Sequence, residues 1–308
     1  MPEYQATETD LNKRFDIVLS EALELPRAQI QKLIKTGGIT LNQKITKAHT
    51  PIKLGDVLSY PTLLMEPPKP KQDPAPILEI IYQDDQIMVI NKPAGLLVHQ
   101  VGPEDQTSTV VDGLLEMFPE TAQVGDDPVR PGIVHRLDKD VSGVMVLAKT
   151  QGAFDNLKEQ FSERSVKKEY LALCYGQLEK DHDTITLKIA RSKTRGRMVA
   201  RPEEQEGKEA HTEYNVLNRF KIATYLKVLI KTGRTHQIRA HFKAIDHPLV
   251  GDKLYKKTRM KNIHPIELNR IFLHAHKLTL TLADGKQKTF ETPLPDDLEE
   301  LLRALPKQ

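Results

Sequence analysis

The sequence predicts an α+β protein: a mixed, mainly antiparallel sheet with flanking helices, preceded by a small N-terminal α/β domain. Apolar, strand-like runs recur from residue 77 onward. Some of these runs follow one another without a helical segment between them, as in 212–220 and 224–230, which disfavours an alternating parallel sheet. A cluster of prolines near residue 70 separates this sheet from the N-terminal domain.

The N-terminal domain is expected over residues 12–62. Its expected elements are a helix around Phe15, Val18 and Leu19, a second helical stretch at 28–38 that Gly37 and Gly38 end, and short strands at 39–46 and 56–61. A proline-rich linker is predicted at 63–77, because proline lacks the backbone N–H that regular structure needs. The second domain is then expected over 78–308.

The second domain should contain a sheet and at least two helices. Helical periodicity appears at 151–161, where Phe154, Leu157 and Phe161 share one face, and again at 236–245. Further strands are predicted at 77–82, 86–92, 142–149, 169–176 and 272–282. Asp138 precedes the run 142–149 directly, so we expect it on a loop at the edge of a rigid sheet.

Composition excludes several classes of protein. Hydrophobic residues make up 39% of the chain and charged residues 28%, as in an ordinary globular protein. No run is long and apolar enough to cross a bilayer, and the polar N-terminus is unlike a signal peptide. Cys174 is the only cysteine, which excludes an internal disulfide and a cysteine-rich zinc site. We therefore expect a cytoplasmic protein, and nothing in the sequence demands more than a monomer.

Basic residues are concentrated in two segments although the net charge is only +3. One segment holds Arg191, Lys193, Arg195, Arg197 and Arg201, and the other holds Lys253, Lys256, Lys257, Arg259 and Lys261. Clustered cations release counterions when they meet a polyanion, so both segments could follow a phosphate backbone. Solvated loops are also often basic, and the clusters alone leave both readings open.

The strongest chemical signal lies in two segments about 100 residues apart. Asp138 stands between basic residues ahead of a buried strand, and a half-buried carboxylate needs a cation to stay ionised. Arg239, on a helix opened by Thr-His-Gln, could supply it as a bidentate partner. A lone aspartate among cations is more often a surface ion pair, and only the combination of these segments favours a catalytic role.

Four motifs in this order resemble the RluA family of pseudouridine synthases. They are NKPAGLLVH at 91–99, HRLDKDVSG at 135–143, KKEYLALCYG at 167–176 and GRTHQIRAH at 233–241. The N-terminal domain is similar to the RNA-binding module named for ribosomal protein S-four. The chain departs from the family's pattern at Val141, which replaces a threonine, and at Pro26 and Gln43, where serine and glycine are common. We interpret Val141 as a packing change.

The resemblance implies roles for individual residues. Asp138 would be the nucleophile, Tyr170 would stack on the target base and help to remove its ring proton, and Arg239 would pair with Asp138. Arg136 would enter the gap that the flipped uridine leaves, and Leu273 would pack against the base or the tyrosine. The remaining expected RNA contacts are His135, Arg27 and Lys35.

The expected reaction exchanges a carbon–nitrogen for a carbon–carbon glycosidic bond, so it needs neither cofactor nor metal. His135, His236 and His241 are interpreted as structural hydrogen-bonding residues, because no third metal ligand stands at a suitable spacing. Large-subunit ribosomal RNA is the expected substrate, and transfer RNA is an alternative. A non-catalytic RNA-binding assembly factor is a second alternative. A glycosidase or phosphatase would need a second carboxylate or metal ligands that the sequence lacks.

Overall fold

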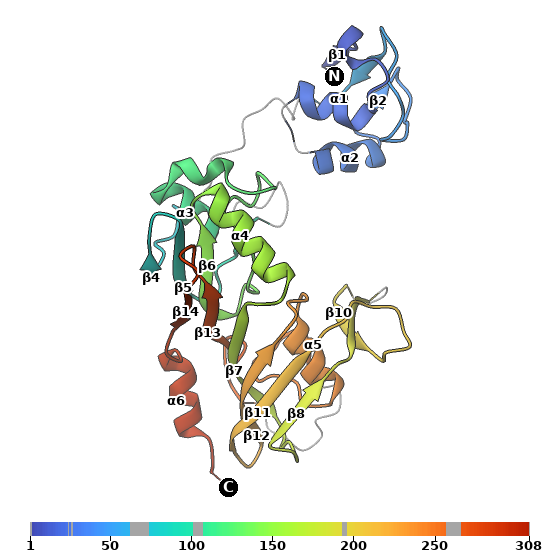
Figure 1. Cartoon of the computed structure of the whole chain (residues 1–308). Coiled ribbons are helices and arrows are strands. Elements are labelled where there is room, and N and C mark those ends of the chain that lie inside the picture. Colours follow the sequence, from blue (N-terminus) through green and yellow to red (C-terminus); the bar gives the residue numbers. More distant parts are fainter. Residues whose placement is uncertain are drawn as a thin grey trace. The chain divides into compact units, whose positions relative to one another are not determined.

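The computed structural model describes residues 2–23, 25, 27–61, 74–100, 107–192, 196–256 and 266–307. The chain divides into two compact units, Met1–Gln72 and Asp73–Gln308 (Figure 1). The expected linker at 63–77 lies outside the described residues except for 74–77. None of the helices in the described part of the chain has the length and hydropathy that crossing a bilayer requires.

The N-terminal unit packs two helices on a small antiparallel sheet of order β1-β3-β2. Its elements are β1 (Glu3–Gln5), a 3-10 turn (Glu8–Asp10), α1 (Phe15–Ala22), α2 (Arg27–Thr36), β2 (Thr40–Leu41) and β3 (Val57–Ser59). Phe15, Ile30 and Leu58 are fully buried in its core. Gln43 adopts a positive φ of 62°, a conformation that costs a side chain energy and that glycine adopts freely. Pro26 lies outside the described residues.

A nine-stranded sheet forms the frame of the second unit (Figure 1). The order is β4-β5-β6-β13-β7-β12-β11-β8, with β14 paired to β13. Only the contact between β6 and β13 is parallel among the described pairs of this sheet. The strands are β4 (Ile80–Gln83), β5 (Ile87–Lys92), β6 (Ser142–Ala148), β7 (Lys167–Tyr175), β8 (His182–Ile185), β11 (Thr212–Arg219), β12 (Ala223–Ile230), β13 (Leu273–Thr281) and β14 (Gln287–Glu291). The predicted α+β class with a mainly antiparallel sheet is confirmed.

Helices cover both faces of this sheet, as the alternation of side chains along β6 requires. Met145 and Leu147 of β6 share a core with α3 and α5, whereas Val144 and Val146 share one with α4. The helices are α3 (Val110–Met117), α4 (Gln151–Ser162), α5 (Gln237–Ala244) and α6 (Asp296–Ala304), with a 3-10 helix at Pro119–Gln123. The helices predicted at 151–161 and 236–245 correspond to α4 and α5.

The first basic segment forms part of a hairpin that the sequence did not indicate. Strands β9 (Lys188–Arg191) and β10 (Met198–Arg201) pair antiparallel and form their own two-stranded sheet. Lys193 and Arg195 lie outside the described residues, as do Lys257, Arg259 and Lys261 of the second basic segment. The strands were missed because basic side chains obscure the period-two alternation that marks a strand.

Candidate active site

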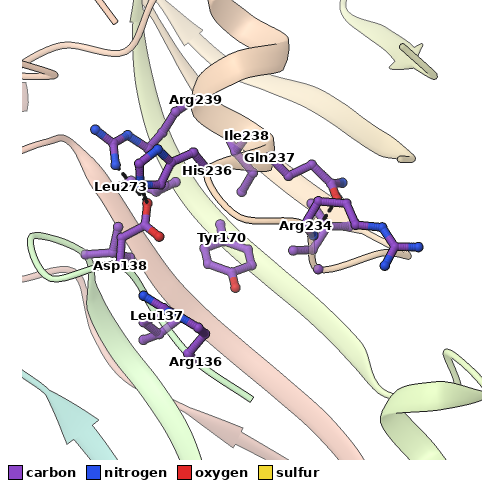
Figure 2. A pocket seen from close by; sticks show the side chains of 13 residues that line it. Arg136, Leu137, Asp138, Tyr170, Arg234, His236, Gln237, Ile238, Arg239 and Leu273 are labelled. Carbon is purple, nitrogen blue, oxygen red and sulfur yellow. Dashed lines mark hydrogen bonds and ion pairs between the residues drawn. The ribbon is translucent and has the colours of Figure 1, made fainter. Parts of the chain in front are cut away.

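A cleft opens where the Asp138 loop, β7, β13 and the start of α5 meet (Figure 2). Its lining combines charged groups with an apolar floor, an arrangement typical of sites that bind an organic ligand. The lining residues are Arg136, Leu137, Asp138, Val141, Tyr170, Ile230, Gly233, Arg234, His236, Gln237, Ile238, Arg239 and Leu273. Segments far apart in the sequence therefore converge on one site.

The Asp138 loop is fixed by backbone contacts with the loop that follows β5. Gly95 N–H donates to Lys139 O at 2.8 Å, and the Lys92 ammonium donates to Lys139 O at 3.1 Å. Lys92 also donates to Pro93 O and Leu96 O, and burial lowers its pKa to about 7. Val141 packs into the core beneath the loop at 2% exposure, as expected for a packing substitution.

Gly143 allows β6 to approach β13 directly behind this loop. A Cβ atom at this position would lie 2.1 Å from Ala275 O, and the backbone adopts a φ of 119°. Only glycine fits both conditions. The Ser-Gly pair after Asp138 thus seats the loop on the parallel β6–β13 contact.

Buried polar contacts set the orientation of α5. His236, the N-cap residue, has a left-handed backbone with a φ of 54°. Gln237 is 3% exposed; its amide nitrogen donates to His211 O and Thr212 Oγ1, and its amide oxygen accepts from Thr232 Oγ1 at 2.7 Å. Because a buried amide with all these partners has one acceptable orientation, the start of the helix is held against β11 and β12.

Arg239 joins two carboxylates at the centre of the site. Its Nη1 donates to Asp138 Oδ2 at 2.9 Å, while its Nε and Nη2 donate to the two oxygens of Asp252 at 2.7 and 3.0 Å. The sequence predicted a bidentate contact with Asp138, and this detail is wrong because Asp252 occupies the bidentate edge. Burial acts to lower the pKa of Arg239, but hydrogen bonds and charge from Asp252 and Asp138 outweigh it and raise the pKa.

Asp252 was missed by the sequence reasoning. Its side chain is fully buried, and Oδ1 also accepts from the backbone N–H groups of Leu254 and Tyr255 at 2.9 and 3.0 Å. The residue stands directly before the second basic segment, whose composition indicated either a phosphate-binding surface or a solvated loop. An acidic residue directly before a run of basic residues is the one signal that could have identified it.

Two further residues extend this network: His236, which the sequence predicted as a structural hydrogen-bonding residue, and Tyr255, which the sequence reasoning missed. His236 Nε2 lies 3.6 Å from Asp138 Oδ2, and its Nδ1 lies 3.1 Å from the Tyr255 hydroxyl. Burial lowers the pKa of His236 although Asp138 acts in the opposite direction. The Tyr255 hydroxyl donates to Met198 O at 2.9 Å, and the Tyr255 ring lies 5.1 Å from the Arg239 guanidinium. Tyr255 thereby links β10 to both residues that contact Asp138.

Tyr170 and Leu273 form the apolar part of the cleft next to Asp138 (Figure 2). They are 9% and 4% exposed. Burial, and after it the negative charge of Asp138, raises the pKa of Tyr170, so its hydroxyl stays protonated at neutral pH. No hydrogen bond joins this hydroxyl to any residue that the structure describes. The structure thus brings Asp138, Tyr170, Arg239 and Leu273 together.

Arg136 and His135 are adjacent in sequence and differ in surroundings. Arg136 is exposed, lines the cleft, and has its Nη1 3.4 Å from His99 Nε2. His135 is not among the lining residues: its Nε2 accepts from Val146 N–H at 3.1 Å, and its ring stacks on Phe161 at 4.6 Å. Burial lowers the pKa of His135 to about 3. This geometry favours the structural interpretation of His135 over RNA binding.

Arg27 and Lys35, the other expected RNA contacts, belong to α2 of the N-terminal unit. Arg27 Nε donates to the buried carboxylate of Asp16 at 2.8 Å, so part of its charge is compensated within the unit. Lys35 is exposed in the last turn of the helix. Their roles in binding RNA stay predictions.

Known proteins share both the sequence and the fold of this chain. Residues 86–244 match the family model of RNA pseudouridylate synthase, and residues 13–58 match the S4 domain. The chain belongs to the RNA pseudouridylate synthase family. It is 40% identical over 301 residues to an uncharacterized RNA pseudouridine synthase of Synechocystis, covering 96% of this chain and 90% of that protein.

Further relatives agree with this assignment. The chain is 37% identical over 300 residues to ribosomal large subunit pseudouridine synthase D of Nitrosomonas europaea, covering 95% of this chain and 84% of that protein. Human RNA pseudouridylate synthase domain containing 1 superposes with a TM-score of 0.56 at 27% identity, covering 79% of this chain and all of that one. The pseudouridine synthase is thus an RNA-modifying isomerase, and its resemblance to the RluA family is confirmed.

Proposed function

We propose that this pseudouridine synthase isomerises uridine in large-subunit ribosomal RNA, with Asp138 as the nucleophile. The observation that supports this proposal most is the contact of 2.9 Å between Asp138 and Arg239 at the rim of a cleft floored by Tyr170 and Leu273. The Asp138 carboxylate is 18% exposed, so a ligand can reach it, while Arg239, at 13% exposure, donates a hydrogen bond to it and fixes its position.

The nucleotide must leave the RNA helix before Asp138 can reach it. Unstacking costs a few kcal/mol, which contacts in the cleft have to offset. Arg136, exposed at the rim, is suited to fill the gap in the stack, and Tyr170 and Leu273 offer apolar surface for the flipped base. These roles also follow from the resemblance of the motifs.

The carboxylate of Asp138 then forms a covalent intermediate, either with the uracil ring or with the ribose C1′ after the base departs. The bond between N1 and C1′ breaks, and a bond between C5 and C1′ forms. The ring carbon C5 loses a proton, and N1 gains one, so no oxidant or added group is needed. Arg239 stays bound to Asp252 throughout and holds Asp138 at a constant position.

The proton on C5 requires an acceptor near Tyr170 or a bound water. Because the raised pKa keeps the Tyr170 hydroxyl protonated, the residue can accept this proton only while it passes its own proton on. Asp138 and His236, which line the same cleft, are side chains that can accept a proton. We propose that Tyr170 packs on the base and relays the proton in this way.

Large-subunit ribosomal RNA is favoured by two observations. A relative with 37% identity carries that substrate in its name, and an S4 domain provides an additional RNA-binding unit for a large structured RNA. We further propose that the enzyme acts as a monomer in the cytoplasm, where ribosomal RNA is found. Carbodiimide mapping of ribosomal and transfer RNA from cells with and without the protein tests the substrate. A pseudouridine lost only from transfer RNA would overturn the proposed target.

Asp138→Asn tests the nucleophile, since it keeps the size of the side chain and removes its charge. We expect tritium release from RNA labelled at C5 of uridine to fall by about 10³-fold or more, while filter binding of the RNA persists. Asp140→Asn, on the exposed part of the same loop, is the matched control and should keep its turnover. Normal turnover by Asp138→Asn would disprove the mechanism.

A further inference from the structure

Lys168 is a buried cation with no counter-ion among the residues that the structure describes, and it lies on the same face of β7 as Tyr170. The two residues are separated by two positions, so their side chains leave the strand on one side. Lys168 is 8% exposed, and its ammonium lies 5.7 Å from the centre of the Phe161 ring. No hydrogen bond or ion pair joins this ammonium to any residue in the described ranges.

Two arginines add positive charge around Lys168. Arg164 precedes it by four residues and is exposed, and Arg234 follows Ile230, the β12 partner of Lys168 in the sheet. Arg234 lines the cleft, and in Figure 2 its guanidinium extends away from Asp138, on the other side of the Tyr170 ring. Burial, and after it the charges of Arg164 and Arg234, lower the pKa of Lys168 to about 8.

This cluster is unfavourable in the free protein. A lysine with only 8% of its surface exposed loses much of its hydration, and the charges of Arg164 and Arg234 add repulsion that no carboxylate in the described residues relieves. An anionic ligand would remove both costs at once. The site therefore has the chemistry of an anion-binding position beside the catalytic cleft.

We propose that Lys168, Arg164 and Arg234 bind a backbone phosphate of the RNA next to the nucleotide that enters the cleft. The inference rests on the proposed function, because it assumes that a uridine occupies the space between Asp138 and Tyr170. Two guanidinium groups and an ammonium offer several donors to phosphate oxygens. The negative charge of Asp138 disfavours a phosphate on its own side, so the RNA backbone passes on the side of Tyr170 that carries Lys168.

Lys168→Met tests this site, because methionine keeps an unbranched apolar chain in the buried position. The probe is a large-subunit ribosomal RNA transcript labelled with tritium at C5 of uridine. Filter binding and tritium release are measured with the full chain at several salt concentrations. We expect Kd and KM to rise by about tenfold at low salt and the slope of log Kd against log salt to become shallower by about one unit. The loss should lie in KM rather than in kcat.

Lys167→Met is the matched control, since Lys167 is exposed on the opposite face of the same strand. Its salt slope should match that of the unaltered protein. Lys168→Arg should restore the slope that Lys168→Met loses, and Arg234→Gln should reduce it even if Lys168→Met fails to fold. Equal slopes for Lys168→Met and Lys167→Met, or a loss independent of salt, would overturn the proposal. Absence of tritium release by the unaltered protein would instead contradict the proposed function, and the binding slopes would still test the phosphate site.

Discussion

The two sides of the Tyr170 ring differ in how charge is compensated. On one side Arg239 contacts two carboxylates, Asp138 at 2.9 Å and the fully buried Asp252. On the other side Arg234 lines the cleft, and its charge acts on the buried Lys168; no carboxylate is paired to either among the described residues. A network in which every charge is paired within the protein keeps its geometry without a ligand. Cations that lack a paired carboxylate are instead stabilised when an anionic ligand binds. The first arrangement suits a reacting group and the second suits a binding contact.

Removing the charge of Asp252, the buried counter-ion of Arg239, should leave the Asp138 side of Tyr170 less fully compensated. This change has the largest expected effect on stability. Asp252→Asn leaves Arg239 with only Asp138 as an anionic partner. Because breaking a buried ion pair is costly, the free energy of unfolding should fall by about 3 kcal/mol. Turnover should also fall by about tenfold or more, since Arg239 no longer has a fixed position. Urea denaturation and tritium release measure the two effects.

Asp181→Asn provides the control for that substitution. Its carboxylate contacts Arg219 at 2.6 Å but is 85% exposed, so solvent screens the pair. An exposed pair of this kind contributes up to about 1 kcal/mol. If Asp252→Asn destabilised the protein no more than Asp181→Asn does, the buried ion pair of Arg239 and Asp252 would not be what holds the site together.

The sequence predicted those parts of the site that local patterns encode. The helix carrying Arg239 follows from periodicity in 236–245, and the Asp138 loop follows from its place before a strand. The resemblance of four motifs to those of the RluA family then predicted that Asp138, Tyr170 and Arg239 share one site. Their proximity depends on the order of strands in the sheet, which no pattern within a single segment specifies.

Asp252 shows why the rest was not predicted. It stands between Gly251 and Lys253 in a segment whose composition indicates an exposed basic loop. Its burial arises from a contact with a helix more than ten residues earlier, and its carboxylate accepts a hydrogen bond from the backbone N–H of Tyr255 in the turn that follows. Such contacts depend on the path of the loop. Likewise, nothing near Lys168 in the sequence reveals that this residue is buried with no counter-ion among the described residues.

Low pH should destabilise the packing of α5, the helix that carries Arg239. His241 of α5 is fully buried: Nε2 lies 2.8 Å from Leu187 O, Nδ1 lies 2.9 Å from Thr212 Oγ1, and burial lowers its pKa to about 4. Between this value and the ordinary 6.5, the unfolded chain binds a proton that the folded chain does not. The folded state therefore loses stability as pH falls, by about 2 kcal/mol from pH 7 to pH 5 for this one residue.

Urea denaturation of the unaltered protein and of His241→Gln at pH 7 and pH 5 measures this contribution. The variant should be less stable at pH 7, yet its loss between the two pH values should be about 2 kcal/mol smaller. His135 and His274, whose pKa values burial lowers to about 3 and about 4, retain the remaining acid sensitivity in both proteins. Identical pH dependence of the two proteins would show that His241 is not held neutral.

The smallest expected effect comes from substituting Tyr255, which contacts His236 and Arg239, the two residues next to Asp138. Tyr255→Phe removes the hydroxyl contacts with Met198 O and His236 Nδ1 but keeps the ring beside Arg239. Losing these two contacts should lower the free energy of unfolding by about 1 kcal/mol and turnover by up to about fivefold. Tyr225→Phe is the control, because no described residue hydrogen-bonds the Tyr225 hydroxyl. If both variants behaved alike in urea denaturation and tritium release, the Tyr255 hydroxyl would contribute nothing. The position of Arg239 would then depend on Asp252 and on the Tyr255 ring.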